Sequence, residues 1–405
     1  MADKKNIPEI RFKGFEEEWE ENKLGKIGET YTGLTGKTKV DFGHGEGKYI
    51  TYMNVFSNTI ANPKMTESVE IDNSQNQVKV GDVLFTTSSE TPQEVGMSTI
   101  WIENTENVYL NSFCFGYRPN IKFDNNYLAY VLRSTSMRKK ISFLAQGISR
   151  YNISKNRVME IDIPTPVEPE QTQIGTYFQN LDSLITLHQR KYNKLLTVKK
   201  AMLEKMFPKE GADVPEIRFK GFVGKWEKKK LGEIGSVVMN RRIFKDQTAE
   251  KGEIPFYKIG TFGGKPDAFI TRELFEEYKN KYPYPKYGDI LISASGSIGR
   301  TVEYLGIDEY FQDSNIVWLE HDQSITNTFL KYFYTVVKWE GLEGSTIKRL
   351  YNKNILDTKI NLPSIIEQTK IGIFFQNLDT LITQHQKQLE KLKNLKKGCL
   401  EKMFV

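Results

Sequence analysis

The stretch EQTQIGTYFQNLDSLITLHQRKYNKLLTVKKAMLEKMF, which covers Glu170–Phe207, decides the fold because it is repeated. The second copy, EQTKIGIFFQNLDTLITQHQKQLEKLKNLKKGCLEKMF, covers Glu367–Phe404 and is identical at 24 of 38 positions. A second repeated segment occurs once before each tail. PEIRFKGFEEEWEENKLGKIG begins at Pro8, and PEIRFKGFVGKWEKKKLGEIG begins at Pro215, with 15 of 21 positions identical. Repeats of this kind mark a repeated structural unit, so the 405 residues are one unit of roughly 200 residues used twice.

Both repeated tails are predicted to be long amphipathic helices. From Ile174 and from Ile371 onward, apolar residues recur at alternating steps of four and three, which is the spacing of a coiled-coil seam. Neither tail contains proline. A helix of about 38 residues is about 57 Å long, and its apolar stripe needs a partner in water. We therefore expect the two helices to pack against each other within the chain as an antiparallel coiled coil.

Two similar tails also offer two equivalent docking surfaces. Two copies of one partner protein can bind such surfaces with pseudo-twofold symmetry. We assign this partner binding to six apolar residues of the seams, namely Phe178, Leu181, Ile185, Phe375, Leu378 and Ile382.

The bodies that precede the tails have diverged from each other. Each contains short β-type runs, a helical stretch near residues 127–143 or 328–341, and a proline-containing strand before the tail. This mixture predicts the α/β (α+β) class, with compact, partly barrel-like bodies. The expected domains are a first body at 1–166, a central helix at 167–207, a second body at 208–365 and a C-terminal helix at 366–405. Conserved ends with different middles indicate that the middles do two different jobs.

Composition narrows the function classes. Two cysteines and four histidines leave no disulfide scaffold and no cysteine-rich zinc module. No apolar run approaches the ~18 residues of a membrane span, and the N-terminal residues do not resemble a secretory signal. We therefore expect a reduced, cytoplasmic protein with no membrane partner. The net charge of +6 is compatible with nucleic-acid binding but does not establish it.

Motifs of catalysis are incomplete. The triplet Gly36-Lys37-Thr38 resembles the end of a phosphate-binding loop, but Tyr31 stands where the first glycine belongs. We predict no catalytic residue, no metal ligand and no cofactor bound by this chain. Two alternatives stay open. One is a Mg²⁺-dependent nuclease that uses Asp267, Glu277 and Lys279, and the other is a coiled-coil scaffold with no role on DNA.

Positive charge is concentrated locally. Between Asp124 and Glu160 there is no acidic residue, and a shorter acid-free window lies between Glu343 and Asp357. Arginine suits phosphates and guanine edges, so these windows favour DNA. The basic residues of the first window are Arg133, Arg138, Lys139, Lys140, Arg150, Lys155 and Arg157.

A basic residue precedes a Tyr-Asn pair in both windows, and small polar loops elsewhere allow close approach of a ligand to the backbone. We therefore predict double-stranded DNA as the ligand. The predicted DNA-binding residues of the first body are Lys37, Tyr52, Asn54, Ser88, Ser89, Arg150, Tyr151 and Asn152. Those of the second body are Arg241, Arg242, Lys258, Ser295, Ser297, Lys348, Arg349 and Tyr351.

With its tandem bodies, duplicated EQ…FxxLDxLI…LEKMF tails and the segments GDVLFTTSS from Gly81 and GDILISASGSIG from Gly288, the chain resembles the specificity (S) subunit of type I restriction–modification systems. The resemblance covers essentially the whole chain. The first body departs from the glycine pattern, because Ser88-Ser89-Glu90-Thr91 replaces Ser295-Gly296-Ser297-Ile298.

This resemblance implies that each body is a target recognition domain and that the tails form a spacer coiled coil. It implies a subunit that reads a bipartite, asymmetric DNA site and recruits two methyltransferase (M) subunits as well as restriction (R) subunits. S-adenosylmethionine would belong to the M subunits, and ATP and Mg²⁺ to the R subunits.

Overall fold

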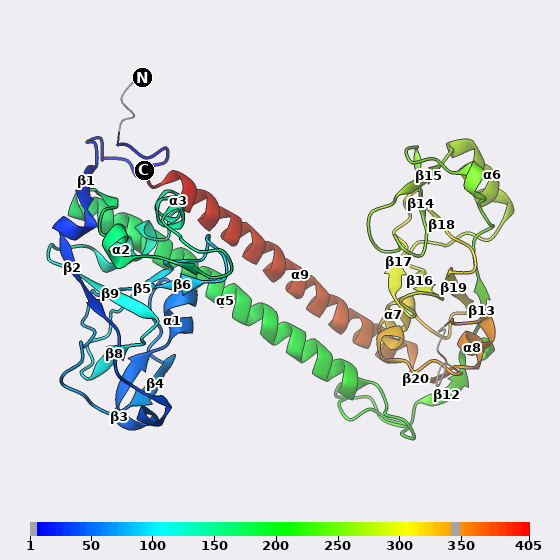
Figure 1. Cartoon of the computed structure of the whole chain (residues 1–405). Coiled ribbons are helices and arrows are strands. Elements are labelled where there is room, and N and C mark those ends of the chain that lie inside the picture. The colour runs from blue at the N-terminus through cyan, green and yellow to red at the C-terminus, as the bar shows by residue number, and fades with distance from the viewer. Residues whose placement is uncertain (1–5, 342–348) are drawn as a thin grey trace. The chain divides into compact units, whose positions relative to one another are not determined.

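The computed structural model describes residues 6–341 and 349–405. The chain divides into two compact units (Figure 1): unit 1 comprises Met1–Gln189 and Lys387–Val405, and unit 2 comprises Arg190–Gln386. Each unit has its own hydrophobic core. None of the helices in the described ranges is both long enough and apolar enough to cross a membrane.

A long helix follows each body. Helix α5 covers Glu168–Met206 and helix α9 covers Ile365–Lys402. In unit 1, Lys396 Nζ donates a hydrogen bond to Asp182 at 2.6 Å. In unit 2, Lys199 Nζ donates to Asp379 at 2.5 Å. In each unit the first part of one helix thus lies beside the last part of the other, so the helices are antiparallel, as predicted.

The body of unit 1 is built on an antiparallel sheet with the order β2-β9-β5-β7 and a smaller sheet with the order β4-β3-β8. The larger sheet comprises β2 (Gly28–Thr32), β9 (Cys114–Pro119), β5 (Val83–Thr86) and β7 (Ser98–Ile100). The smaller one comprises β4 (Thr66–Val69), β3 (Phe42–Ile50) and β8 (Val108–Leu110). The body also contains β1 (Glu20–Lys23) paired with β11 (Asp162–Thr165), β6 (Ser88–Ser89) paired with β10 (Tyr151–Asn152), and α-helices α1 (Tyr52–Ser57), α2 (Asn125–Val131), α3 (Thr135–Phe143) and α4 (Lys155–Val158).

Unit 2 repeats this framework. Its larger sheet has the order β13-β19-β16-β17, and its smaller one has the order β15-β14-β18. These strands are β13 (Gly235–Val238), β19 (Ile316–His321), β16 (Ile290–Ser293), β17 (Thr301–Glu303), β15 (Ala268–Ile270), β14 (Ile254–Tyr257) and β18 (Tyr310–Phe311). This body also contains β12 (Glu227–Lys230) paired with β20 (Lys359–Leu362), and α-helices α6 (Arg272–Lys281), α7 (Asn327–Val336) and α8 (Asn352–Asp357). The predicted α/β class with two repeated bodies is confirmed.

The repeated segment near Pro8 and Pro215 ties each body to its long helix. Arg11 makes a bidentate ion pair with Glu170, with nitrogen–oxygen distances of 2.7 and 2.8 Å. Arg218 pairs with Glu367 in the same way, at 2.7 Å for both contacts. The two glutamate side chains are almost fully buried, so each needs the opposite charge beside it. This requirement gives a physical reason why both the IRF and the EQ sequences recur.

Burial of Glu309 predicts a pH-dependent stability for unit 2. The residue is only 7% exposed, and burial raises the pKa of its carboxyl group to about 7. Because the pKa of this carboxyl group is higher in the folded than in the unfolded chain, its protonation favours the folded state. This contribution to stability is complete below about pH 4.5 and is lost as the pH rises through about 7. We expect Glu309→Gln to flatten the change in unfolding free energy between pH 5 and 8, by roughly 2–3 kcal/mol. Thermal unfolding across that range measures the effect, and the exposed Glu320→Gln is the control. Equal pH dependence in Glu309→Gln and the unmodified chain would contradict it.

Candidate nucleic-acid interface

Six of the predicted DNA-binding residues of the first body meet at one place. Strands β6 and β10 pair there, with Ser88 opposite Asn152 and Ser89 opposite Tyr151. Tyr52 Oη donates a hydrogen bond to the Ser88 carbonyl at 2.6 Å. Because β6 follows the central strand β5, the sheet fixes the position of this cluster.

We call Tyr52, Ser88, Ser89 and Arg150–Asn152 junction 1. Both serines are buried, whereas Arg150 and Asn152 are exposed. The serines therefore form the support, and the arginine and asparagine are the groups that a ligand can reach.

The second body has a corresponding arrangement. The Leu350 amide donates to the Ala294 carbonyl at 2.8 Å, which places the segment that begins at Arg349 along the loop that follows β16. Ser295 Oγ donates to Asn315 Oδ1 at 2.7 Å, and Arg349 Nη2 donates to the Ser314 carbonyl at 3.4 Å.

We call Ser295, Asn315, Arg349 and Tyr351 junction 2. The Arg349 guanidinium lies 5.8 Å from the ring centre of Tyr351, which is 63% exposed. Asn315 was missed in the sequence because it belongs to no repeated motif. Lys348 lies outside the described residues.

The other predicted residues of unit 2 have partners of their own. Arg242 forms an ion pair with Asp313 at 2.9 Å, which connects it to the loop that carries Asn315. The Arg241 guanidinium lies 5.2 Å from the ring centre of Tyr282. Ser297 is exposed, and its carbonyl accepts a hydrogen bond from Ser293 Oγ at 2.5 Å. Of these residues, Arg242 and Ser297 lie close to junction 2.

The prediction for Asn54 is wrong. Its side chain is fully buried, and Nδ2 donates to the carbonyls of Asn62 at 2.8 Å and Met65 at 3.1 Å. Its Oδ1 accepts from the Asn62 amide at 2.8 Å. The side-chain amide thus closes the loop after α1. Its nitrogen and oxygen are both hydrogen-bonded inside the protein, so the group is not accessible to DNA.

Two arginines of the acid-free window are also internal. Arg133 donates to the carbonyls of Ser98, Val55, Phe56 and Asn58 at 2.7–3.0 Å. Arg138 donates in the same manner to the carbonyls of Gln93, Val95 and Gly96. Burial lowers the pKa of each guanidinium to about 10, which still leaves both charged at neutral pH. The exposed cations of this window are Lys139, Arg150 and Arg157.

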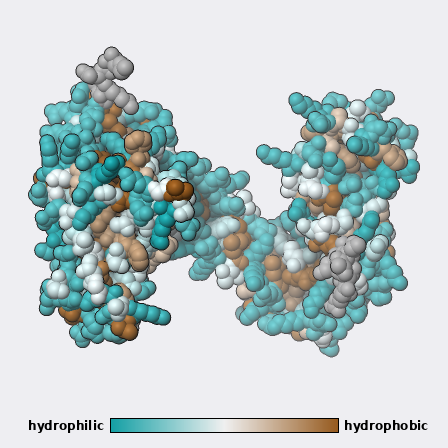
Figure 2. Space-filling view, viewed as in Figure 1, coloured by the Kyte–Doolittle hydropathy of each residue, from teal (hydrophilic) through white to brown (hydrophobic). Residues whose placement is uncertain are grey.

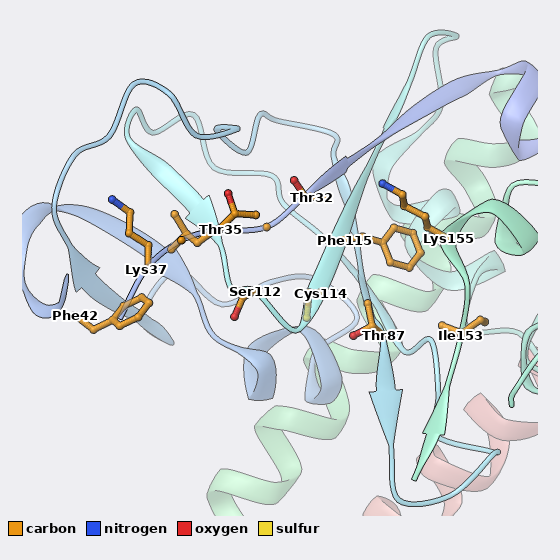
Figure 3. Close-up of a pocket in the computed structure, with 13 residues that line it drawn as sticks. Thr32, Thr35, Lys37, Phe42, Thr87, Ser112, Cys114, Phe115, Ile153 and Lys155 are labelled. Atoms are coloured by element: carbon orange, nitrogen blue, oxygen red, sulfur yellow. The ribbon is translucent and has the colours of Figure 1, made fainter. Parts of the chain in front are cut away.

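A cavity of about 520 Å³ lies beside junction 1 (Figure 3). Thr87 and Ile153 line it, and the Ile153 amide donates to the Thr87 carbonyl at 2.9 Å. Lys37 and Lys155 lie on opposite sides of the cavity. Lys37 pairs with Asp72 at 2.7 Å, and this contact raises the pKa of Lys37. The predicted DNA-binding residues did not include the hydroxyl residues of the wall, which are Thr32, Thr35, Thr87 and Ser112.

The residues of the nuclease alternative do not converge. Asp267 pairs with Lys258 at 2.8 Å, and Glu277 pairs with Lys281 at 3.0 Å. Lys279 pairs with Asp308 at 3.4 Å. Across residues 6–341 and 349–405, no three acidic, histidine or cysteine residues come together in a metal-binding group. The described geometry does not support the nuclease alternative.

Most of the seam residues assigned to partner binding are covered by their own unit. Phe178, Leu181, Phe375, Leu378 and Ile382 are buried, and Ile185 is partly buried. The ring of Phe178, for example, stacks on Tyr130 at 5.0 Å and on Phe404 at 5.6 Å between centres. A buried side chain cannot contact a partner, so the docking assignment needs correction.

Exposed apolar residues on the long helices are better placed for docking. They are Leu184, Leu187, Leu196, Ile365, Ile366, Ile373, Leu381 and Leu395. Leu184 and Leu381 occupy equivalent positions of the two repeats and have nearly equal exposures of 43% and 42%.

Comparisons with known proteins agree with this architecture. The family model for the type I restriction modification DNA specificity domain matches residues 16–197 and 224–394. A putative type I restriction enzyme specificity subunit from Haemophilus influenzae is 41% identical over 286 residues, covering 68% of this chain and 72% of that protein. The putative MjaX specificity subunit from Methanocaldococcus jannaschii is 24% identical over 420 aligned positions, covering 96% and 93%.

Solved structures show the same fold. The S subunit of a type I system from M. genitalium has a TM-score of 0.54 at 17% identity and covers 98% of this chain and 99% of that chain. A chain from a study of complex assembly in the type I restriction–modification system has a TM-score of 0.53 at 19% identity, covering 94% and 96%. The chain therefore belongs to the family of type I restriction–modification DNA specificity subunits, which are non-catalytic components of these systems.

Proposed function

We propose that this chain reads a bipartite, asymmetric site on double-stranded DNA, with junction 1 reading one half and junction 2 the other. One observation carries the proposal. In both units a basic residue and a tyrosine lie along the loop that follows the same strand of the same sheet, β5 or β16. The side chains around that framework differ between the units. A shared framework with different side chains suits two half-sites of different sequence.

The chemistry of the junctions fits this role. Arg150 and Arg349 carry exposed guanidinium groups that suit a phosphate or the edge of guanine. Asn152 is exposed as well, and an asparagine amide can pair with the major-groove edge of adenine. The buried serines opposite Tyr151 and Asn152 have small side chains, so the backbone of this strand pair can approach DNA closely.

The proposal includes partners. Two M subunits would dock on the long helices through the equivalent exposed residues Leu184 and Leu381, and R subunits would join that assembly. S-adenosylmethionine, ATP and Mg²⁺ would be brought by those partners. Support comes from the duplicated exposed leucines, because two like surfaces fit two copies of one partner.

Mapping methylated adenines in host DNA tests the proposal. We expect one motif made of two short defined blocks separated by a spacer of constant length and free sequence, and we expect it to disappear when this gene is deleted. Restoring the gene is the control. A single continuous motif, or methylation that persists without the gene, would contradict the proposal.

Arg349→Ala is expected to weaken DNA binding about tenfold or more, because a well-placed arginine contact with a base is worth about 1–3 kcal/mol. Titration of the target duplex at several salt concentrations distinguishes the two possible contacts. A base contact relaxes the sequence preference at one position. A phosphate contact weakens all sequences alike and lowers the salt slope by about one. The control is Lys286→Ala. This exposed lysine precedes the first residue of β16, whereas junction 2 lies after its last residue. Unchanged affinity in Arg349→Ala would remove this residue from the interface.

A further inference from the structure

A short hairpin of unit 1 carries an exposed isoleucine at its tip. The Gln146 amide donates to the Asn152 carbonyl at 2.9 Å, and the Asn152 amide donates back to Gln146 at 2.8 Å. We call Gln146–Asn152 the tip hairpin. Its base continues into the β10–β6 pair of junction 1, and the following residue, Ile153, is buried. The hairpin is therefore anchored to the proposed DNA-reading surface.

The tip itself projects away from the core. Residues 147–150 are exposed, and Ile148 is 95% exposed. Gly147 makes the turn possible, because its φ is +137° and a Cβ at this position would come 2.1 Å from the Arg150 carbonyl. Isoleucine is among the residues most often buried, and burial of its side chain favours folding. An isoleucine held out on a closed hairpin therefore contributes little to the stability of the free protein.

The residues next to Ile148 in the sequence favour a ligand that carries negative charge and also offers an apolar part. Arg150 lies two residues away and is exposed, and no acidic residue occurs between Asp124 and Glu160. On the face shown in Figure 2, hydrophobic residues reach the surface in small patches among hydrophilic ones. A single apolar side chain beside a cation suits DNA, whose stacked bases lie between charged phosphates. Several DNA-bending proteins insert an isoleucine, leucine or phenylalanine between two base pairs.

We propose that Ile148 is a wedge that inserts into one base step of the half-site read by unit 1, while Arg150 binds a neighbouring phosphate. This inference rests on the proposed function. It adds a source of specificity that needs no hydrogen bond to a base, since a step that unstacks easily, such as pyrimidine–purine, costs less to open. The half-site of unit 1 is expected to contain such a step.

The test uses the full chain assembled with its methyltransferase partner, without methyl donor, and a duplex that carries the mapped site. Single 2-aminopurine substitutions are placed at the purines of both strands in the half-site of unit 1, leaving out the methylated adenine. We expect fluorescence to rise several-fold at one step. Ile148→Ala should abolish this rise and weaken binding about tenfold, which is about 1.4 kcal/mol. Ile148→Met should keep both, because methionine also serves as a wedge.

Val223→Ala is the matched control, because Val223 is 89% exposed and lies in unit 2 outside junction 2. It should bind as the unmodified chain does. Three outcomes overturn the wedge: Ile148→Ala binding within twofold of the unmodified chain, no fluorescence change at any step, or an Ile148→Ala defect confined to subunit assembly on gel filtration. The proposed function survives these outcomes if Arg150→Ala still weakens binding. Failure of the unmodified complex to distinguish the mapped site from a scrambled duplex overturns both.

Discussion

Exchanging residues 215–365 for the second body of another subunit of this family is expected to change one half of the DNA site and leave the other half as it was. Affinity for the original duplex should fall at least about 10³-fold, because one half of the specific contacts is replaced. The physical reason is that each unit has a separate core. Phe404 from the end of the chain packs in the core of unit 1, and Phe375 packs in the core of unit 2.

The exchange has to keep the contacts that join body to helix. The incoming body should retain Arg218, because Glu367 is buried and its bidentate partner is this arginine. Methylome sequencing of cells that carry the hybrid reads out the new site, and the reciprocal exchange of residues 8–166 is the matched control. A hybrid in which both halves of the site change would rule out two independent reading bodies.

Arg133→Ala is expected to destabilise unit 1 by roughly 3–5 kcal/mol, although it removes one of the positive charges that first indicated DNA binding. Its guanidinium donates to four backbone carbonyls, and these would lose a charged donor in a mostly buried site. For a unit of this size the melting temperature should fall by about 10 °C.

Arg150→Ala is the matched variant, because it removes the same charge from an exposed position of the same window. It should leave the melting temperature nearly unchanged and weaken DNA binding about tenfold. Differential scanning calorimetry and DNA titration on both proteins separate the two roles. An Arg133→Ala protein that melts normally but fails to bind DNA would reverse the assignment.

Local patterns in the sequence predicted the repeated architecture well. The heptad spacing of the tails predicted two long helices, because that spacing places every seam residue on one side of a helix. Short β-type runs were predicted in each body, and strands β5 and β16 follow Gly81 and Gly288. The sequence also showed a basic residue before a Tyr-Asn pair in each body. In the structure each of these segments lies beside the loop that follows β5 or β16.

The function of individual polar residues depended on distant parts of the chain. Arg133 donates to a carbonyl 78 residues away at Val55, whereas Arg150, in the same acid-free window, remains exposed. Asn54 is buried by a loop that closes over it, whereas Asn152 is exposed at the edge of a two-strand pair. Residue type and local spacing do not distinguish Arg133 from Arg150, or Asn54 from Asn152.

The sequence by itself therefore determined the duplicated unit, its long helices and its family, since these follow from repetition and periodicity along the chain. Only the tertiary structure decided which charged side chains are internal supports and which are exposed. A buried carbonyl needs a hydrogen-bond donor wherever the fold places it, and its position relative to an arginine is set by packing between segments far apart in the chain.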